Sequence, residues 1–190
     1  MRKHRSECWR GSPRRGFTLI ETALAIVIIG TGVLSILSAQ AAFHKQNDWS
    51  THTSSATLLA NEVREMMTRL PLNDPVTGTS FWGPESNEAT LADFDDLDDF
   101  DGAFGEGVVF SAADGTGPIN AMREVIPGMT GWSQIVKVFN VDPTNISASG
   151  DPNLDGTTNM IRIEVTVTYQ GANDPDPVEV TTVSWVTGHS

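Results

Sequence analysis

The feature that most restricts the fold of this chain is an apolar run that contains a single charge. Residues 17–43 are 27 consecutive residues among which Glu21 is the only ionisable side chain. As an α-helix the run spans about 40 Å, which exceeds the roughly 30 Å hydrocarbon core of a bilayer. A carboxylate at the centre of a membrane helix costs about 2.5–3.5 kcal/mol on insertion scales, so it needs a partner or a purpose. The run therefore predicts a membrane helix in which Glu21 has a specific task.

A helical pattern continues after the apolar run. Residues 44–48 are polar, and beyond them apolar residues recur at spacings of three and four until Pro71. This spacing predicts an amphipathic helix that Pro71 ends. The apolar positions are Ala56, Leu59, Val63, Met66 and Leu70. Because no proline occurs between residues 17 and 70, we expect one straight helix of about 80 Å, whose second part, 44–70, covers the globular region 71–190.

Charge is divided unevenly along the chain. Residues 1–16 contain six basic residues against Glu7, whereas residues 71–190 contain nineteen acids against three basic residues. Basic residues before a membrane helix keep that end in the cytoplasm, so the globular region is expected on the other side. The acidic body argues against a nucleic-acid partner, because phosphate contacts require clustered Lys and Arg. The only cysteine is Cys8, so a body without the leader has no disulfide and must rely on its core, a metal ion or its neighbours.

Three kinds of export segment compete for this N-terminus. Arg14-Arg15 looks like a twin-arginine start, and Ala39-Gln40-Ala41 offers an A-x-A cleavage site. Secretory apolar regions usually run about 7–15 residues, however, and this one is longer and contains an acid. A plain single-span anchor fits the length but leaves Glu21 unexplained. The third kind is a precursor in which the acid takes part in assembly.

The sequence GFTLIE, residues 16–21, resembles the type IV prepilin signature, in which a short basic leader ends at a glycine. The resemblance implies that prepilin peptidase cuts after Gly16, so that 1–16 is the leader. It also implies that the new N-terminal residue, Phe17, is methylated on its amine. Glu21 is then expected to pair with the N-terminal amine of a neighbouring subunit, since two charges that are each costly in lipid satisfy one another.

Two further stretches are similar to the minor-pilin group called type IV pilus modification proteins. They are residues 20–40, with Ala25, Gly32 and Gln40, and ATLLANEVREMM, residues 56–67. The resemblance implies the α+β type IV pilin fold, a long N-terminal helix packed on an antiparallel sheet of three or four strands. Beyond residue 70 the likeness is one of pattern alone.

The patterns beyond Gly107 are those of strands. Residues 160–170 alternate strictly, which indicates a half-buried antiparallel strand with Ile161, Ile163, Val165, Val167 and Tyr169 on one face. Strands are also predicted within 107–112, 131–143 and 176–188. In the last of these the apolar phase changes, which predicts a bulge near Thr181-Thr182. Residues 71–106 are rich in turn residues and acids and are predicted to form a long, partly structured loop.

One candidate cation site is the segment DPNLDGTTN, residues 151–159. Its D-x-N-x-D-G spacing is that of the first half of a calcium loop, so Asp151, Asn153 and Asp155 are candidate calcium ligands. The twelfth position should be a glutamate but is Arg162. The same residues also suit a simple turn before a strand, so calcium stays a possible cofactor only.

A second acidic segment, residues 91–106, interleaves six aspartates with apolar residues. The apolar spacing predicts a short helical turn anchored on the body, with the acids outward. The carboxylates then form a solvated loop, a cation site or a surface for a basic partner. They are Asp93, Asp95, Asp96, Asp98, Asp99 and Asp101. Because no Ser/His/Asp or Cys/His grouping is visible, we expect no enzyme activity.

These observations favour a structural minor subunit of a type IV pilus or related filament. Its expected partners are other pilin subunits, prepilin peptidase and the bacterial inner membrane, where it begins with its N-terminus in the cytoplasm. A pseudopilin of a type II secretion system shares every N-terminal feature. A membrane-tethered or secreted calcium-binding module is the alternative from a different class.

Overall fold

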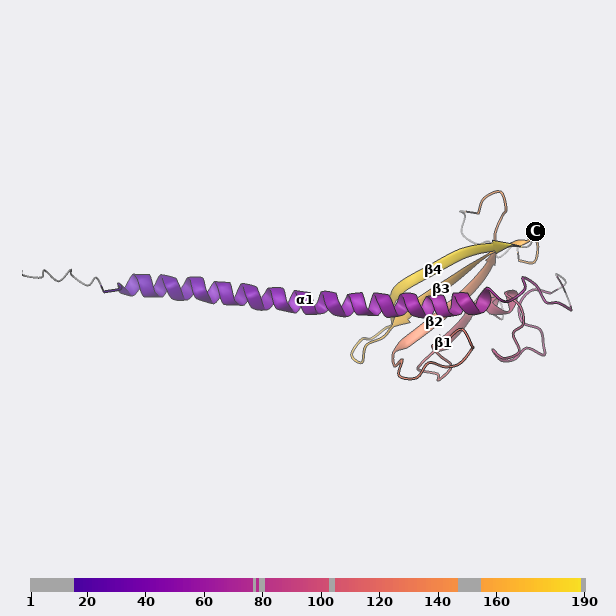
Figure 1. Cartoon of the computed structure of the whole chain (residues 1–190), viewed down its shortest axis with the longest axis horizontal. Helices are drawn as coiled ribbons and strands as arrows, with labels where there is room; N and C mark the ends of the chain where they lie inside the picture. The colour runs from indigo at the N-terminus through magenta and orange to yellow at the C-terminus, as the bar shows by residue number, and fades with distance from the viewer. Residues whose placement is uncertain (1–15, 77, 79–80, 103–104, 147–154, 189–190) are drawn as a thin grey trace, which may run out of the picture. The chain divides into compact units, whose positions relative to one another are not determined.

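The computed structural model describes residues 16–76, 78, 81–102, 105–146 and 155–188, and its contacts divide the chain into two compact units, Met1–Asp48 and Trp49–Ser190. Helix α1, Leu19–Met67, contributes its first part to one unit and its last part to the other (Figure 1). The helix is continuous, as expected from the absence of proline between residues 17 and 70. The helix ends three residues before Leu70, because the last backbone turn tightens. There Arg69 and Leu70 donate their N–H groups to carbonyls only three residues back.

The second unit contains a four-stranded antiparallel sheet in the order β1-β2-β3-β4. The strands are β1 Val108–Ser111, β2 Trp132–Asn140, β3 Met160–Tyr169 and β4 Val178–Gly188. Each lies within the range predicted for it, and consecutive strands are neighbours in the sheet. The arrangement of one long N-terminal helix and this sheet confirms the α+β fold expected for a type IV pilin.

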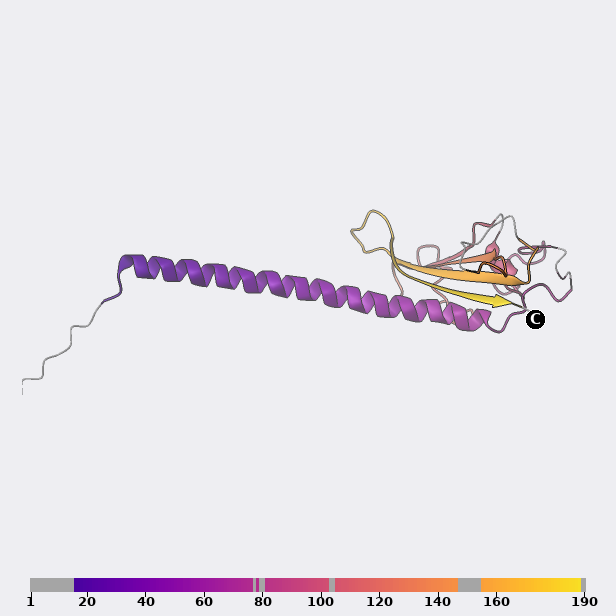
Figure 2. The same cartoon turned by 90° about the horizontal axis from the view of Figure 1, so that it is seen from above.

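The last part of α1 covers one face of this sheet, as Figure 2 shows from above. The predicted apolar positions of the helix are buried, apart from the half-buried Leu70. They share one hydrophobic core with the inward side chains of β3, because residues two apart on a strand face the same side. These β3 side chains, all fully buried, are Ile161, Ile163, Val165 and Val167. The amphipathic stripe and the strand alternation therefore meet as predicted.

The phase change in β4 is a bulge. Thr181 lies opposite Val167 and Glu179 lies opposite Thr168, which leaves Val180 as an extra residue on β4. An extra residue reverses the faces of the residues after it, so Val180, Val183 and Trp185 all pack partly against the core. The bulge was predicted near Thr181-Thr182 and is found one residue earlier.

Gln134 is the polar centre of this core. It is fully buried on β2, where its side-chain Nε2 donates to the carbonyls of Leu59 on α1, at 2.9 Å, and of Ile119, at 3.1 Å. Its Oε1 accepts the backbone N–H of Ile119 at 2.7 Å. One side chain thus joins the helix, the sheet and the loop between β1 and β2. Its three hydrogen bonds are buried and therefore shielded from water.

The segment between α1 and β1 is irregular, as predicted, apart from a short 3₁₀ helix, η1, at Asp98–Asp101. The apolar residues Phe94, Leu97 and Phe100 anchor it in the core, which confirms the predicted helical turn. The prediction that its acids point outward is wrong for four of the six. Asp96, Asp98, Asp99 and Asp101 are buried, with exposed fractions of 4% or less, while Asp93 and Asp95 are exposed.

The aspartates are buried because tight turns leave backbone N–H groups without backbone partners, and carboxylates accept them. Asp96 accepts the N–H groups of Asp98 and Asp99, at 3.0 and 3.2 Å. Asp99 accepts those of Asp95 and Asp96, at 2.8 and 3.2 Å. Asp101 accepts the indole N–H of Trp82 at 2.8 Å. The acids therefore hold the loop together from inside.

Candidate functional site

The N-terminal end of α1 is fixed by Thr18. Its carbonyl accepts the N–H of Glu21 at 3.0 Å and that of Thr22 at 3.2 Å, and its hydroxyl oxygen lies 3.3 Å from the Glu21 nitrogen as a second acceptor. Thr18 is therefore the N-cap, and Glu21, at the third helical position, completes the Thr-x-x-Glu spacing of a capping box. A carboxylate in the first turn also suits the positive end of the helix dipole.

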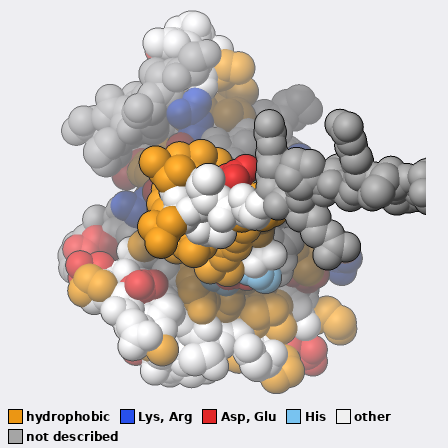
Figure 3. Space-filling model, turned by 90° about the vertical axis from the view of Figure 1, so that its left-hand side faces the viewer, with side chains coloured by type: hydrophobic (Ala, Val, Ile, Leu, Met, Phe, Trp, Pro, Cys, Tyr) orange, Lys and Arg blue, Asp and Glu red, His pale blue; other side chains and the backbone are white. Residues whose placement is uncertain are grey.

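The apolar part of α1 is exposed all the way round. From Phe17 to Phe43 the large hydrophobic side chains keep half or more of their surface free, up to 88% for Leu19. Figure 3, seen from the side where α1 begins, shows hydrophobic side chains over most of this helix end. The helix is long and apolar enough to cross a membrane, and no part of its most apolar window is buried inside the chain. A surface of this kind is stable in lipid or against other helices.

The hydroxyl side chains of this helix are satisfied by the helix itself. Thr22, Thr31, Ser35 and Ser38 each donate to a carbonyl three or four residues back, at 2.8 to 3.0 Å. Such bonds remove the cost of placing a hydroxyl in hydrocarbon. The Glu21 carboxylate differs, because no hydrogen bond or ion pair to it is found within the described residues. Within the described part of the apolar run, residues 17–43, Glu21 is therefore the one charged side chain, and no partner for its carboxylate is found there.

The comparison with protein families agrees with this geometry. Residues 11–37 match the family model of the prokaryotic N-terminal methylation motif. The chain carries the type IV prepilin signature. The motif covers the cap, the glycine before it and most of the apolar helix. No curated protein and no solved structure matches this chain.

The predicted calcium ligands of the chain lie at the edge of the described structure. Asp151 and Asn153 fall outside the described residues, whereas Asp155 begins the described part of the turn before β3 and is half-buried. Arg162, which occupies the twelfth loop position, lies on β3 opposite Val186. Calcium at this loop therefore stays a prediction.

The acidic segment, residues 91–106, contains carboxyl groups with raised pKa values. Burial, together with a hydrogen bond from its side chain to Asp96, raises the pKa of Asp98 to about 9, so this group is protonated at neutral pH. Burial likewise raises the pKa of Asp101, against the opposing effect of the Trp82 hydrogen bond. Burial is also the main cause of the raised pKa of Asp99. The segment thus carries less charge than its six aspartates imply.

Two features of the structure were not predicted from the sequence. The capping role of Thr18 could have been predicted from the sequence, because Thr-x-x-Glu before an apolar run is a known pattern at the start of a helix. The acids Asp74, Glu85 and Glu88 were not singled out, yet their carboxylates come together. Glu85 and Glu88 flank a turn in which the Glu85 N–H donates to Glu88 Oε2 at 2.9 Å. Their meeting with Asp74 depends on the path of the loop, which no local pattern predicts.

Proposed function

We propose that this chain is a minor subunit of a type IV pilus or a related filament. The observation that carries the proposal is the coincidence, in residues 11–37, of the N-terminal methylation motif with a fully exposed apolar helix that contains one unpartnered acid. The globular unit then remains at the filament surface, where its exposed acidic side chains are solvated. This role requires assembly contacts and no catalytic site.

Processing after Gly16 is the first step of the proposed pathway. Gly16 and Phe17 precede the helix and are exposed, so a peptidase can reach the bond between them without unfolding α1. A Cβ built on Gly16 meets nothing within 4 Å, so the fold of the chain itself does not require a glycine here. A requirement for this glycine would therefore come from the peptidase.

Cleavage creates the second charge of the proposed assembly step. The new amine of Phe17 lies in the same segment as the Glu21 carboxylate, and both enter the apolar environment of the filament core. Pairing the amine of one subunit with Glu21 of the next removes two unpaired charges at once and sets the axial register. The basic residues of the leader favour an N-terminus in the cytoplasm of an inner-membrane precursor.

The mature N-terminus tests this proposal. Membranes of cells that express the native chain with a prepilin peptidase should yield a protein that begins with N-methylated Phe17 by mass spectrometry. Gly16→Leu should leave the precursor uncut, whereas the matched change Gly32→Ala inside the helix should leave processing unchanged. A mature protein that begins near Phe43, or an intact Met1, would contradict the proposal.

The same chemistry serves a pseudopilin of a type II secretion system, so the choice of filament needs a separate experiment. Co-purification of the mature chain with the pilin subunits of sheared surface filaments supports the pilus assignment. Recovery only with the secretion apparatus in the membrane supports the pseudopilin assignment. A mature chain that stays monomeric in both fractions would favour the membrane-tethered calcium-binding module instead.

A further inference from the structure

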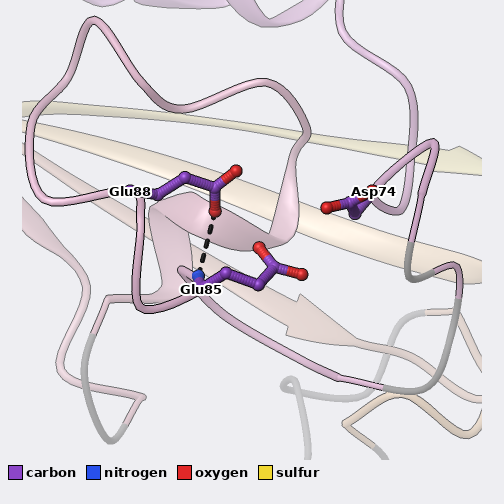
Figure 4. A group of neighbouring side chains, drawn as sticks. All are labelled: Asp74, Glu85 and Glu88. Carbon is purple, nitrogen blue, oxygen red and sulfur yellow. Dashed lines mark hydrogen bonds between the residues drawn. The ribbon is translucent and has the colours of Figure 1, made fainter.

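Five carboxylates from three separate turns gather beside η1. One oxygen each from Asp74, Glu85 and Glu88 lie within 4.8 Å of one another, and so do oxygens from Glu88, Asp95 and Asp99. Figure 4 shows Asp74 on one stretch of the loop, facing Glu85 and Glu88 on another stretch. Glu88 belongs to both groups, so the two sets form one continuous cluster. No Lys or Arg among the described residues forms an ion pair with Glu88, Asp95 or Asp99.

Asp99 adds an independent observation to this cluster. Its side chain is fully buried, and its Oδ2 already accepts two backbone N–H groups. Its Oδ1 is buried and has no hydrogen-bond partner within the described part of the chain. A buried carboxylate oxygen without a donor is costly, so native proteins satisfy it with a proton, a water molecule or a cation. A carboxylate oxygen of Asp99 lies within 4.8 Å of oxygens of Glu88 and Asp95, so a cation held among these three acids would supply this carboxylate with a further partner.

We propose that Glu88, Asp95 and Asp99 bind a divalent cation, and that calcium is the ion that fits best. All ligands are carboxylate oxygens, with no His or Cys among them, which is the donor set of a hard cation. Two oxygens on opposite sides of Ca²⁺, each bonded at about 2.4 Å, are about 4.8 Å apart. The observed separations therefore accommodate the ion with little movement. Asp95 is exposed and gives the ion access from solvent.

Asp74 and Glu85 also lie close to Glu88 and add negative charge beside the site. A cation held by Glu88, Asp95 and Asp99 would join the turn at residues 85–88 to the 3₁₀ helix η1, which packs on β2. The loop between α1 and β1 has few strand hydrogen bonds and no cysteine, so an ion would supply the cross-link that a disulfide supplies elsewhere. This inference does not depend on the proposed filament role.

A proton shared between Glu88 and Asp99 is the competing way to satisfy the cluster. Two close carboxylates share a proton when no cation separates them. The two arrangements differ in one measurable respect, since only the metal site gains stability from added calcium. The experiment below separates them.

The test is a calcium titration of the full chain in detergent micelles after treatment with a chelator. Calorimetry should detect binding, and the thermal unfolding midpoint of the globular unit should rise by several degrees in excess calcium. Asp95→Asn removes an exposed ligand without disturbing the core and should weaken binding at least about tenfold. Asp99→Asn, in which the amide oxygen can still accept the two N–H groups, should have a similar effect.

Two controls define the site. Asp114→Asn, an exposed acid in the loop after β1, should bind calcium like the unmodified chain. Asp155→Asn should also leave this binding intact, because it alters only the loop at residues 151–159. Unchanged affinity in both Asp95→Asn and Asp99→Asn, or loss of binding in Asp155→Asn alone, would overturn the proposal. An unmodified chain that binds no calcium would overturn it too and would favour the shared proton.

Discussion

At the scale of single residues, Glu21 has two physical roles that must be separated. As the third residue of α1 it suits the helix start that Thr18 caps, and it also carries a charge that nothing in the described chain compensates. Glutamine serves a capping box as well as glutamate does, but it carries no charge. The two roles therefore respond differently to one substitution.

Glu21→Gln should leave the helix and its processing intact and abolish assembly. The charge that pairs with the Phe17 amine is lost, while the cap is kept. Immunodetection should find the processed protein in membranes at normal levels and at most about a tenth of it in sheared filaments, since a lost pair of this kind is worth at least about 1.4 kcal/mol. Glu65→Gln, an exposed position in the same helix, is the control. Normal amounts of the Glu21→Gln protein in filaments would show that its charge is not used.

Among the polar side chains described in the globular unit, we expect Gln134 to contribute most to stability, because it is fully buried and makes three hydrogen bonds. Gln134→Leu keeps the volume but leaves the N–H and carbonyl of Ile119 buried without their partner. We expect the free energy of unfolding to fall by about 2–4 kcal/mol. Urea unfolding of the full chain in detergent, followed by tryptophan fluorescence, measures this change.

The matched control for this experiment is Gln170→Leu. Gln170 is exposed directly after β3, where its side-chain amide donates to the carbonyls of Asp174 and Pro175 in the next turn. This change should cost less than about 1 kcal/mol, because water replaces the lost bonds. Equal effects at the two positions would mean that the buried hydrogen bonds of Gln134 do not stabilise the fold.

At the scale of elements, the contact between α1 and the sheet has an internal control in two adjacent leucines. Leu59 is 1% exposed and packs in the core, whereas Leu58 is 62% exposed. Leu59→Ala should lower the free energy of unfolding by about 2–5 kcal/mol, through lost burial and the cavity that it leaves. Leu58→Ala should change it by no more than about 0.5 kcal/mol. Denaturant midpoints of both variants test this, and similar losses would mean that the helix packs through another face.

The same elements show what the sequence could and could not reveal. The faces of α1 and β3 were predictable because a helix and a strand each bury residues at a fixed period. Even the bulge at Val180 was visible as a change of phase along β4. The acidic segment was misread because charge alone suggests solvent. Whether Asp96 or Asp99 turns inward depends on which backbone N–H groups the loop leaves unpaired, and that is a property of the folded loop.

The residues of the two candidate sites could be predicted from the sequence only in part. Gly16, Phe17 and Glu21 are adjacent in the chain, so a local motif is enough to find them. Asp74, Glu88 and Asp99 come from three turns that are distant in sequence. No spacing rule joins them, and only the fold reveals that they meet.

At the scale of the whole molecule, every buried hydrophobic residue of the described chain lies in the unit Trp49–Ser190, starting with Ala56. Residues 16–48, the described part of the first unit, expose their apolar side chains and add none to that core. Lipid or neighbouring helices must therefore cover the first unit, whereas the second can bury its own core in water.

A fragment of residues 49–190 should therefore be soluble and folded without detergent. We expect one cooperative urea transition with a midpoint close to that of the globular unit in the full chain, because only the first helical turn after the cut loses its neighbours and frays. Circular dichroism and size-exclusion chromatography measure this outcome. A fragment that begins at Asn61 loses Ala56, Leu59 and Ala60 from the core and should not fold. If the 49–190 fragment also aggregates, the apolar segment before it is needed for folding as well as for membrane insertion, and the two units are not independent.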